Sequence, residues 1–306
     1  EVFLVGHSDG QLRFRFQAGS TAVSAIRDSE IRAARIRIEY DRNALRQALR
    51  YADWGAAAAV LVRPLLPVLP FVDVPNNNQA GTAMETLLYL MRAAGERMLV
   101  GNAAAREEAL KQYTVALAFA DALAKADWFG GSEEAAFRGV ICLLELGRPE
   151  EAGQRLEEAT VPGEMDDAFG FYALARAMYY AGREEWIDAL GTGVESVVFE
   201  TKSIDSFPPA MVLVGRCYEG TAQWYRARDV YLALGRLFRG TVYERHAIGR
   251  LRGILEEGHT AEEEPQAVHQ VFFTGRENVN EKVQELVDAY VERIQKEKEA
   301  SNDNRK

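Results

Sequence analysis

The fold is decided by the segment Ala136-Phe-Arg-Gly-Val-Ile-Cys-Leu-Leu-Glu-Leu-Gly-Arg-Pro-Glu-Glu-Ala152. Apolar and small residues recur at helical spacing before Gly147, and a second helical stretch follows it. Pro149 is expected at the start of this second helix, where its missing N–H removes no hydrogen bond. The segment therefore predicts two antiparallel helices joined by a short turn, with small residues where the helices touch.

This hairpin recurs between Ser132 and Gly240. The turns between paired helices align at spacings of 35 and 40 residues on Gly147, Gly182 and Ala222. Small residues before each turn then align as Gly139-Val140, Leu174-Ala175 and Val214-Gly215. Inside the second helices the alignment matches Ala152, Ile187 and Ala227. A period of this size predicts stacked helical hairpins.

In spacing and residue type these units resemble tetratricopeptide repeats. The third unit places Gly215, Tyr218, Ala227 and Tyr231 where that family uses Gly, Tyr, Ala and an aromatic residue. The second unit departs from the pattern, because Gly191 stands where an aromatic is usual, and the family's terminal Pro is missing throughout. The resemblance covers about half of the chain. It implies a mainly α protein, with an α-α superhelical array over residues 41–298.

Residues 1–40 are expected to form a small N-terminal antiparallel β-meander. From Leu12 to Phe16, apolar residues alternate with arginines, which is the pattern of a half-buried strand. Asp9-Gly10 and Gly19-Ser20 are turn signals. The other expected strands are Val2–His7, Thr21–Ile26 and Arg32–Ile38. Their order resembles small SH3-like or Sm-like barrels.

The run from Gly6 to Gly10, Gly-His-Ser-Asp-Gly, matches the pattern of esterase nucleophiles. That chemistry needs a strained turn from a strand into a helix and a second loop that donates to the oxyanion. Here only five residues precede the motif and a strand follows it. We therefore interpret Asp9-Gly10 as a hairpin turn.

The helical region is expected to begin with a helix capped by Asp41. Next, Gly55–Val72 is nearly all apolar, but its second half carries prolines at positions 64, 67 and 70. These prolines argue against a membrane span and favour a buried helix, Trp54–Val62, leading into an extended segment. An exposed lipid- or partner-binding loop is the alternative, so the burial of residues 60–72 stays open.

Long helices are expected before and after the repeats. The helices expected before the repeats are Gln79–Val100 and Ala103–Ala126, and the second of these is capped by Asn102. The helices expected after the repeats are Val242–Glu257, which Gly258 ends, and the amphipathic stretch Glu281–Lys298, which suits a helix capping the array. Residues 299–306 are expected to be a disordered tail.

Composition favours a globular protein with protein partners. Of the 306 residues, 48% are hydrophobic, which is enough for an ample core. The net charge of −10 argues against nucleic acid or an anionic membrane as the main partner.

Two cysteines, Cys142 and Cys217, exclude a disulfide scaffold; buried thiols are expected, with one long-range disulfide as the alternative. The sequence begins at Glu1 rather than Met, which suggests a processed or trimmed chain and favours a periplasmic or secreted location over a cytoplasmic one.

Signals for catalysis are weak. No two of the four histidines are four residues apart, as in helical zinc motifs, and no cysteine lies near them in sequence. Gly191-Thr-Gly193 lacks the preceding strand and the third glycine of a dinucleotide-binding fingerprint. Acidic pairs such as Glu150-Glu151 lie at helix starts, where they complement the helix dipole. We predict no enzyme activity, no cofactor and no metal site.

The predicted function is that of a non-catalytic protein-binding scaffold, with a bacterial cell envelope as its expected location. The alternative is a structural subunit whose repeats build a homo- or hetero-oligomer.

The resemblance to tetratricopeptide repeats implies that the first helix of each pair lines a concave binding face. Carried onto this chain, it gives as candidate partner-binding residues Phe137, Phe169, Tyr172, Arg176, Tyr179, Arg216 and Glu219. Tyrosine and arginine dominate binding hot spots, and Arg176 and Arg216 suit a partner carboxylate, although the tyrosines could instead pack between helices.

Overall fold

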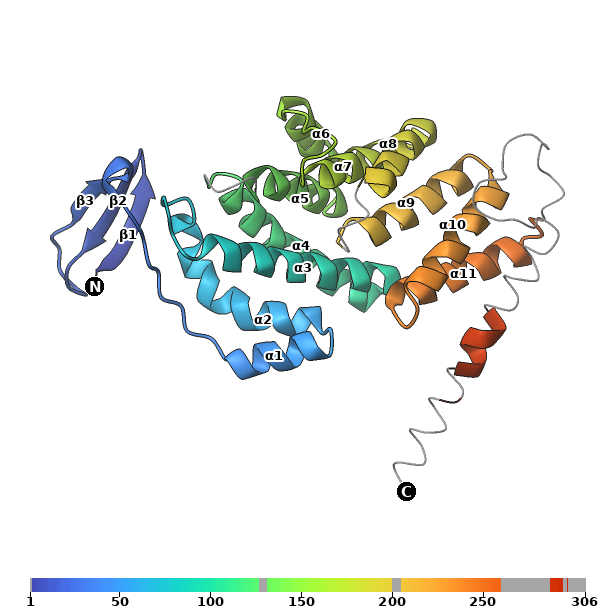
Figure 1. Cartoon of the computed structure of the whole chain (residues 1–306), viewed down its shortest axis with the longest axis horizontal. Coiled ribbons are helices and arrows are strands. Elements are labelled where there is room, and N and C mark those ends of the chain that lie inside the picture. The colour runs from blue at the N-terminus through green and yellow to red at the C-terminus, as the bar shows by residue number, and fades with distance from the viewer. Residues whose placement is uncertain (1, 127–130, 200–204, 260–286, 294–295, 297–306) are drawn as a thin grey trace, which may run out of the picture.

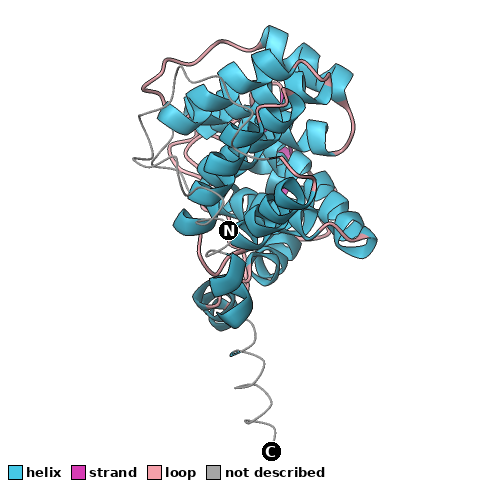
Figure 2. Cartoon of the chain, turned by 90° about the vertical axis from the view of Figure 1, so that its right-hand side faces the viewer, coloured by secondary structure: helices cyan, strands magenta, loops and turns pink. Residues whose placement is uncertain are grey.

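The computed structural model describes residues 2–126, 131–199, 205–259, 287–293 and 296. The chain is mainly α-helical with a small three-stranded sheet at its N-terminal end (Figure 1), which confirms the predicted fold class. A view turned by 90° shows helices throughout the body of the molecule (Figure 2).

The sheet is an antiparallel meander of β1 (Phe3–Ser8), β2 (Gln11–Arg15) and β3 (Ser24–Arg27). Ser8 pairs with Gln11, so the loop between β1 and β2 has two residues. Both have positive φ, 54° at Asp9 and 68° at Gly10, as a tight hairpin turn requires. Gly6–Gly10 is therefore a strand and turn, as the sequence predicted, and no helix follows it.

The predicted strand Arg32–Ile38 is wrong. This stretch is extended but forms only one isolated bridge, between Ala34 and Asn77. The backbone of Ile36 is instead bound by side chains: its N–H donates to Asn78 Oδ1 at 2.7 Å, and its carbonyl accepts from Gln79 Nε2 at 2.5 Å. Within residues 2–40 the sheet has three strands and does not close into a barrel.

The core beneath the sheet is completed by the helical region. Leu12 packs with Phe71 and Val74, and all three are buried. His7 joins the same two parts: its Nε2 lies 2.9 Å from Asp28 Oδ1, and its Nδ1 lies 2.9 Å from Asp73 Oδ1. The meander is thus docked on the helices by an apolar cluster and an imidazole held between two carboxylates.

Docking of the meander is expected to depend on pH. Burial lowers the pKa of His7, but Asp28 and Asp73 outweigh burial and raise this pKa above its usual value. Only the imidazolium offers a proton to both carboxylates. The stabilisation is therefore fully present below about pH 6.5 and is lost as pH rises through the raised pKa. Amide hydrogen exchange in β1 and β2 should accelerate over that range beyond its intrinsic pH dependence. His7→Gln should abolish the added pH dependence; an unchanged profile in this variant would refute the assignment.

The helices alternate with short turns along the rest of the chain. They are α1 (Arg42–Arg50), α2 (Trp54–Leu65), η2 (Leu66–Phe71), α3 (Ala80–Val100), α4 (Ala103–Leu123), α5 (Gly131–Glu145), α6 (Pro149–Glu158), α7 (Phe169–Gly182), α8 (Trp186–Phe199), α9 (Phe207–Gly220), α10 (Trp224–Leu237) and α11 (Val242–Glu256). Two predicted caps are confirmed: Asp41 accepts from Asn43 N at 2.8 Å, and Asn102 accepts from Ala105 N at 2.8 Å.

The apolar stretch after Asp53 is a helix throughout. The extended segment predicted after Val62 is wrong, because α2 continues to Leu65 and passes into the 3₁₀ helix η2. Leu61, Leu65 and Leu69 are buried, whereas Leu66 is 44% exposed. By length and composition, Trp54–Phe71 is the one stretch of the described residues that could cross a membrane. Its buried leucines belong to the core that it shares with α3.

Successive helices pack as neighbours, from α1 on α2 through to α10 on α11. The first helices of successive pairs also contact one another: α5 packs on α7, α7 on α9, and α9 on α11. The long helix α3 runs along this layer and contacts both α5 and α11 (Figure 1). The face that would be open in a simple array is therefore covered by α3.

The turns between paired helices share one hydrogen-bond pattern. Gly147, Glu184, Ala222 and Gly258 have positive φ and lie 37, 38 and 36 residues apart. After each of them an N–H bonds back to a helix carbonyl, as from Arg148 to Leu143 at 2.9 Å, a Schellman-type helix end. The second turn thus centres on Glu184, not on Gly182, which still belongs to α7. The predicted alignment of the second unit is wrong by two residues.

The corrected alignment also changes the second helices. The matching positions are Ala152, Ala189 and Ala227, which are all fully buried. Ile187, which the sequence alignment placed there, is 78% exposed. Two residues turn a helix by about 200°, so this shift moves a residue from one side of the helix to the other.

The predicted C-terminal capping helix, Glu281–Lys298, lies partly outside the described residues, and the predicted tail, residues 299–306, lies wholly outside them. In the described part, Val287 is buried against the last helices, and Arg293 pairs with the buried Glu244 of α11. Cys142 and Cys217 are both buried and free, so the alternative disulfide is not formed. Burial raises the pKa of Cys217 to about 11.

Candidate functional site

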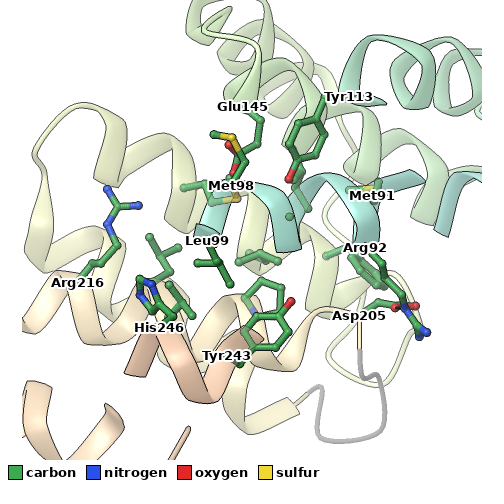
Figure 3. A pocket seen from close by; sticks show the side chains of 18 of the residues that line it. Met91, Arg92, Met98, Leu99, Tyr113, Glu145, Asp205, Arg216, Tyr243 and His246 are labelled. Carbon is green, nitrogen blue, oxygen red and sulfur yellow. Dashed lines mark hydrogen bonds and ion pairs between the residues drawn. The ribbon is translucent and has the colours of Figure 1, made fainter. Parts of the chain in front are cut away.

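A cavity of 560 Å³ lies between α3 and the first helices of the array (Figure 3). We call it the central cavity. Apolar side chains make up most of its wall: Leu88, Met91, Met98, Leu99, Ile141, Phe171, Leu174, Met178, Val212 and Leu213. Such a wall excludes water and favours apolar ligand groups, and methionines allow it to adapt in shape.

The charged groups at one end of the cavity are already paired. Arg92 binds Asp205 and lies over the ring of Trp54. Arg138 binds Glu134 at 2.7 Å and stacks over the ring of Phe171 at 3.8 Å. Arg138 is only 2% exposed, so these contacts offset its desolvation. Figure 3 shows Arg92 and Asp205 together at this end.

The other end presents polar groups that are not paired in this way. Arg216 lines the cavity, is exposed, and has no hydrogen bond or ion pair among the described residues. His246 Nε2 is buried without a hydrogen-bond partner there. Glu219, by contrast, accepts two hydrogen bonds from Arg250, at 2.9 and 2.6 Å. Arg216 and His246 thus both line this end of the cavity (Figure 3).

The pKa shifts at this end follow from burial and from the arginines. Burial lowers the pKa of His246 to about 4, helped by the charges of Arg250 and Arg216, so the ring is neutral at pH 7. Burial raises the pKa of Glu145, and the charges of Arg216 and Arg106 oppose that rise. Burial also raises the pKa of Tyr113 well above its usual value. Arg216 and Glu145 thus both line the cavity without an ion pair among the described residues, and burial favours the neutral form of Glu145.

Seven candidate binding residues were named from the sequence. Among the described residues that line the central cavity, two of these seven are found, Arg216 and Glu219. Phe137, Phe169 and Tyr172 are buried in the helical core, where the Phe137 and Tyr172 rings meet edge to face at 5.2 Å. Truncating Tyr172 would therefore disturb packing as well as any binding.

Arg176 and Tyr179 are half-buried on other faces of α7. Arg176 donates to the hydroxyls of Tyr172 and Tyr180, each at 3.1 Å. The ring of Tyr179 packs beside Gly153 of α6, and its hydroxyl accepts from Arg183 at 2.9 Å. The structure thus brings Arg216 and Glu219 together at the cavity and places the other five between helices or away from it.

The two-residue alignment error explains why the residues selected on α7 do not line the central cavity. Ile141 and Arg216 each lie six residues before a turn centre, at Gly147 and Ala222, and both line the cavity. The matching residue before Glu184 is Met178, which lines the cavity too, whereas the sequence alignment selected Arg176. Sequence analysis also missed the whole contribution of α3, because no repeat pattern marks that helix as covering the array.

Among the described residues, no three His, Cys, Asp or Glu side chains come together as a metal site would need. The chemistry that the central cavity offers is binding: apolar walls for non-directional contact and Arg216 as a directional donor for an anion. Comparisons with protein-family models, with curated proteins and with solved structures found no match.

Proposed function

We propose that this protein is a non-catalytic binding scaffold of the tetratricopeptide-like class, and that the central cavity receives an apolar segment of a protein partner. The observation that carries the proposal is a mostly apolar cavity between α3 and the helices α4, α5, α7, α9 and α11, with an arginine at one end that has no ion pair among the described residues. Two further observations support the assignment to the repeat class: the turns are spaced 36 to 38 residues apart, and successive helices pack as neighbours.

The length of the cavity favours a peptide segment as occupant. Its lining extends from Leu88 on α3 to Gly101 at the end of that helix, which is about 20 Å at 1.5 Å per residue. An extended peptide rises about 3.3 Å per residue, so roughly six residues fit along this length. Arg216 would pair with a carboxylate of the segment, either an acidic side chain or a C-terminus.

A cavity-filling substitution tests this proposal. A Cβ atom on Gly95 would lie 3.6 Å from the hydroxyl of Tyr113, so the side chain in Gly95→Leu would enter the cavity. We expect this variant to bind the anionic apolar dye anilinonaphthalene sulfonate at least about tenfold more weakly. It should also lose the partner that the wild type captures from native extract.

Gly81→Leu is the matched control. Gly81 lies on the same helix, is exposed, and has open space where its Cβ would be. Both variants replace a helical glycine and should melt at or above the wild-type temperature. If Gly95→Leu is stably folded and binds dye and partner as the wild type does, the cavity is not the binding site.

A second candidate function, assembly into an oligomer, is favoured by α8. Ile187, Val194 and Val198 lie on one stripe of this helix and are 78%, 37% and 58% exposed. In the apolar stretch 65–72, by contrast, four of the eight residues are buried and Leu66 is the exposed large hydrophobic side chain. Light scattering distinguishes the two functions: a concentration-dependent mass that falls in Val198→Asp but not in Gly95→Leu favours assembly.

A further inference from the structure

A second, smaller pocket lies where the linker after the sheet meets the start of α3. It has a volume of 340 Å³, and we call it the arginine pocket. Its lining residues are Arg35, Ile36, Arg37, Ile38, Tyr40, Arg42, Asn78, Gln79 and Thr82. It shares no residue with the central cavity.

The charge around this pocket opposes that of the whole protein. Residues 32–50 contain six arginines and two acidic residues, although the chain has a net charge of −10. Both acids are engaged: Glu39 pairs with Arg37 at 2.8 Å, and Asp41 caps α1. Arg35 and Arg42 are exposed and have no ion-pair partner among the described residues. The pocket therefore presents uncompensated positive charge.

The N-terminus of α3 adds further donors. The helix has 21 residues and begins at Ala80. Asn77 Oδ1 accepts from the N–H groups of Gln79 and Ala80, at 2.7 and 3.2 Å. The N–H groups of Gly81 and Thr82 lie in the first turn and have no acceptor within the helix. They and the helix dipole favour an anion at this end.

A buried acceptor sets the chemistry of the anion. Gln79 is only 5% exposed, and its Oε1 is buried without a hydrogen-bond partner. Its Nε2 donates to the carbonyl of Ile36 at 2.5 Å, which fixes the amide, since the flipped amide would bring two oxygens together. The pocket thus offers several donors, and the Gln79 that lines it has one unpartnered acceptor, which together favour a ligand with negative charge and one acidic proton.

We propose that the arginine pocket binds a phosphate group in a form that retains a P–OH. The charged oxygens would bind Arg35, Arg42 and the first turn of α3, and the P–OH would donate to Gln79 Oε1. Hydrogenphosphate keeps such a hydroxyl at pH 7, and phosphate monoesters keep it below about pH 6. Sulfate has no proton to donate, so it would bring an oxygen against the buried acceptor.

Calorimetric titration with inorganic phosphate and with sulfate, at pH 7 and matched ionic strength, tests the site. We expect saturable binding of phosphate and at least about tenfold weaker binding of sulfate, because a buried polar group left unpaired discriminates strongly. Equal affinity for both anions would overturn the proposal, since non-specific attraction to arginine gives that result. Absence of phosphate binding would overturn it as well.

Two arginines of α1 provide matched variants. Arg42 lines the pocket, whereas Arg46 is exposed on the same helix outside it. Arg42→Gln should weaken phosphate binding about tenfold, and Arg46→Gln by less than about twofold. Equal losses would mean diffuse electrostatic attraction and refute the site. Gln79→Met should remove the preference for phosphate over sulfate. If this variant does not fold, the titration of the wild type with phosphate and with sulfate still tests the proposal.

Vesicles distinguish the source of the phosphate group. Phosphatidylcholine vesicles with and without phosphatidate carry the group on a lipid headgroup. Binding only to phosphatidate vesicles, competed by free phosphate and lost in Arg42→Gln, identifies a headgroup site. Binding of free phosphate without vesicle recruitment identifies a soluble phosphorylated ligand.

Discussion

Leu65→Asp is expected to lower the free energy of unfolding by about 3 kcal/mol or more, because it buries an unpaired carboxylate. Leu65 is fully buried on α2, in a core cluster with Leu61, Leu69 and Leu87. The carboxylate must be desolvated or take up a proton, and either process destabilises the folded state. Urea unfolding followed by circular dichroism measures the loss.

Leu66→Asp is the neighbouring control. Leu66 is 44% exposed and begins η2, so its replacement should change the unfolding free energy by less than about 1 kcal/mol. The test of burial in residues 60–72 therefore rests on Leu65, which is fully buried, and not on Leu66. Equal losses in the two variants would show that this segment does not pack as described.

Gly215→Leu is expected to be the second large effect, a loss of about 3 kcal/mol in unfolding free energy. A Cβ atom at position 215 would lie 2.6 Å from the ring of Tyr231 on α10. Tyr231 is fully buried, so its ring cannot move aside without separating α9 from α10. Thermal melting and urea unfolding should both register the loss.

Gly249→Leu tests whether the effect comes from this close approach or from glycine itself. Gly249 lies on α11, is exposed, and has nothing within 4 Å of its Cβ position. Replacing it should leave stability unchanged or raise it by about 0.5–1 kcal/mol, since glycine is a poor helix former. A comparable loss at Gly249 would argue against steric contact as the cause at Gly215.

Local signals were sufficient for the elements and several of their ends. Asp9-Gly10 predicted the hairpin turn, and Asp41 and Asn102 predicted helix caps, because each depends on atoms a few residues apart. The small residues of the hairpin Ala136–Ala152 likewise predicted close packing of paired helices. In these cases the physical interaction is local, so the sequence contains it directly.

The turn between α7 and α8 was misplaced for a specific reason. Glycine is the usual residue for a left-handed helix end, and the sequence alignment placed this turn on Gly182. The chain instead uses Glu184, with φ of 61°, where a side chain is mildly strained; Ala222, which the alignment placed correctly, has φ of 58° at the matching position of the next turn. Packing of Ala189 and Ala227 in the core fixes the turns there. Tertiary contacts therefore outweighed local preference.

The sequence by itself determined that this is a helical array of hairpins with a small N-terminal sheet, because periodicity, caps and turns report short-range physics. Only the tertiary structure decided that α3 covers the array, that Arg216 rather than Arg176 faces the cavity, and that Phe71 and Val74 complete the core of the sheet. These outcomes join residues far apart in the chain. They depend on which surfaces bury the most apolar area together, a property of the whole fold that no local pattern carries.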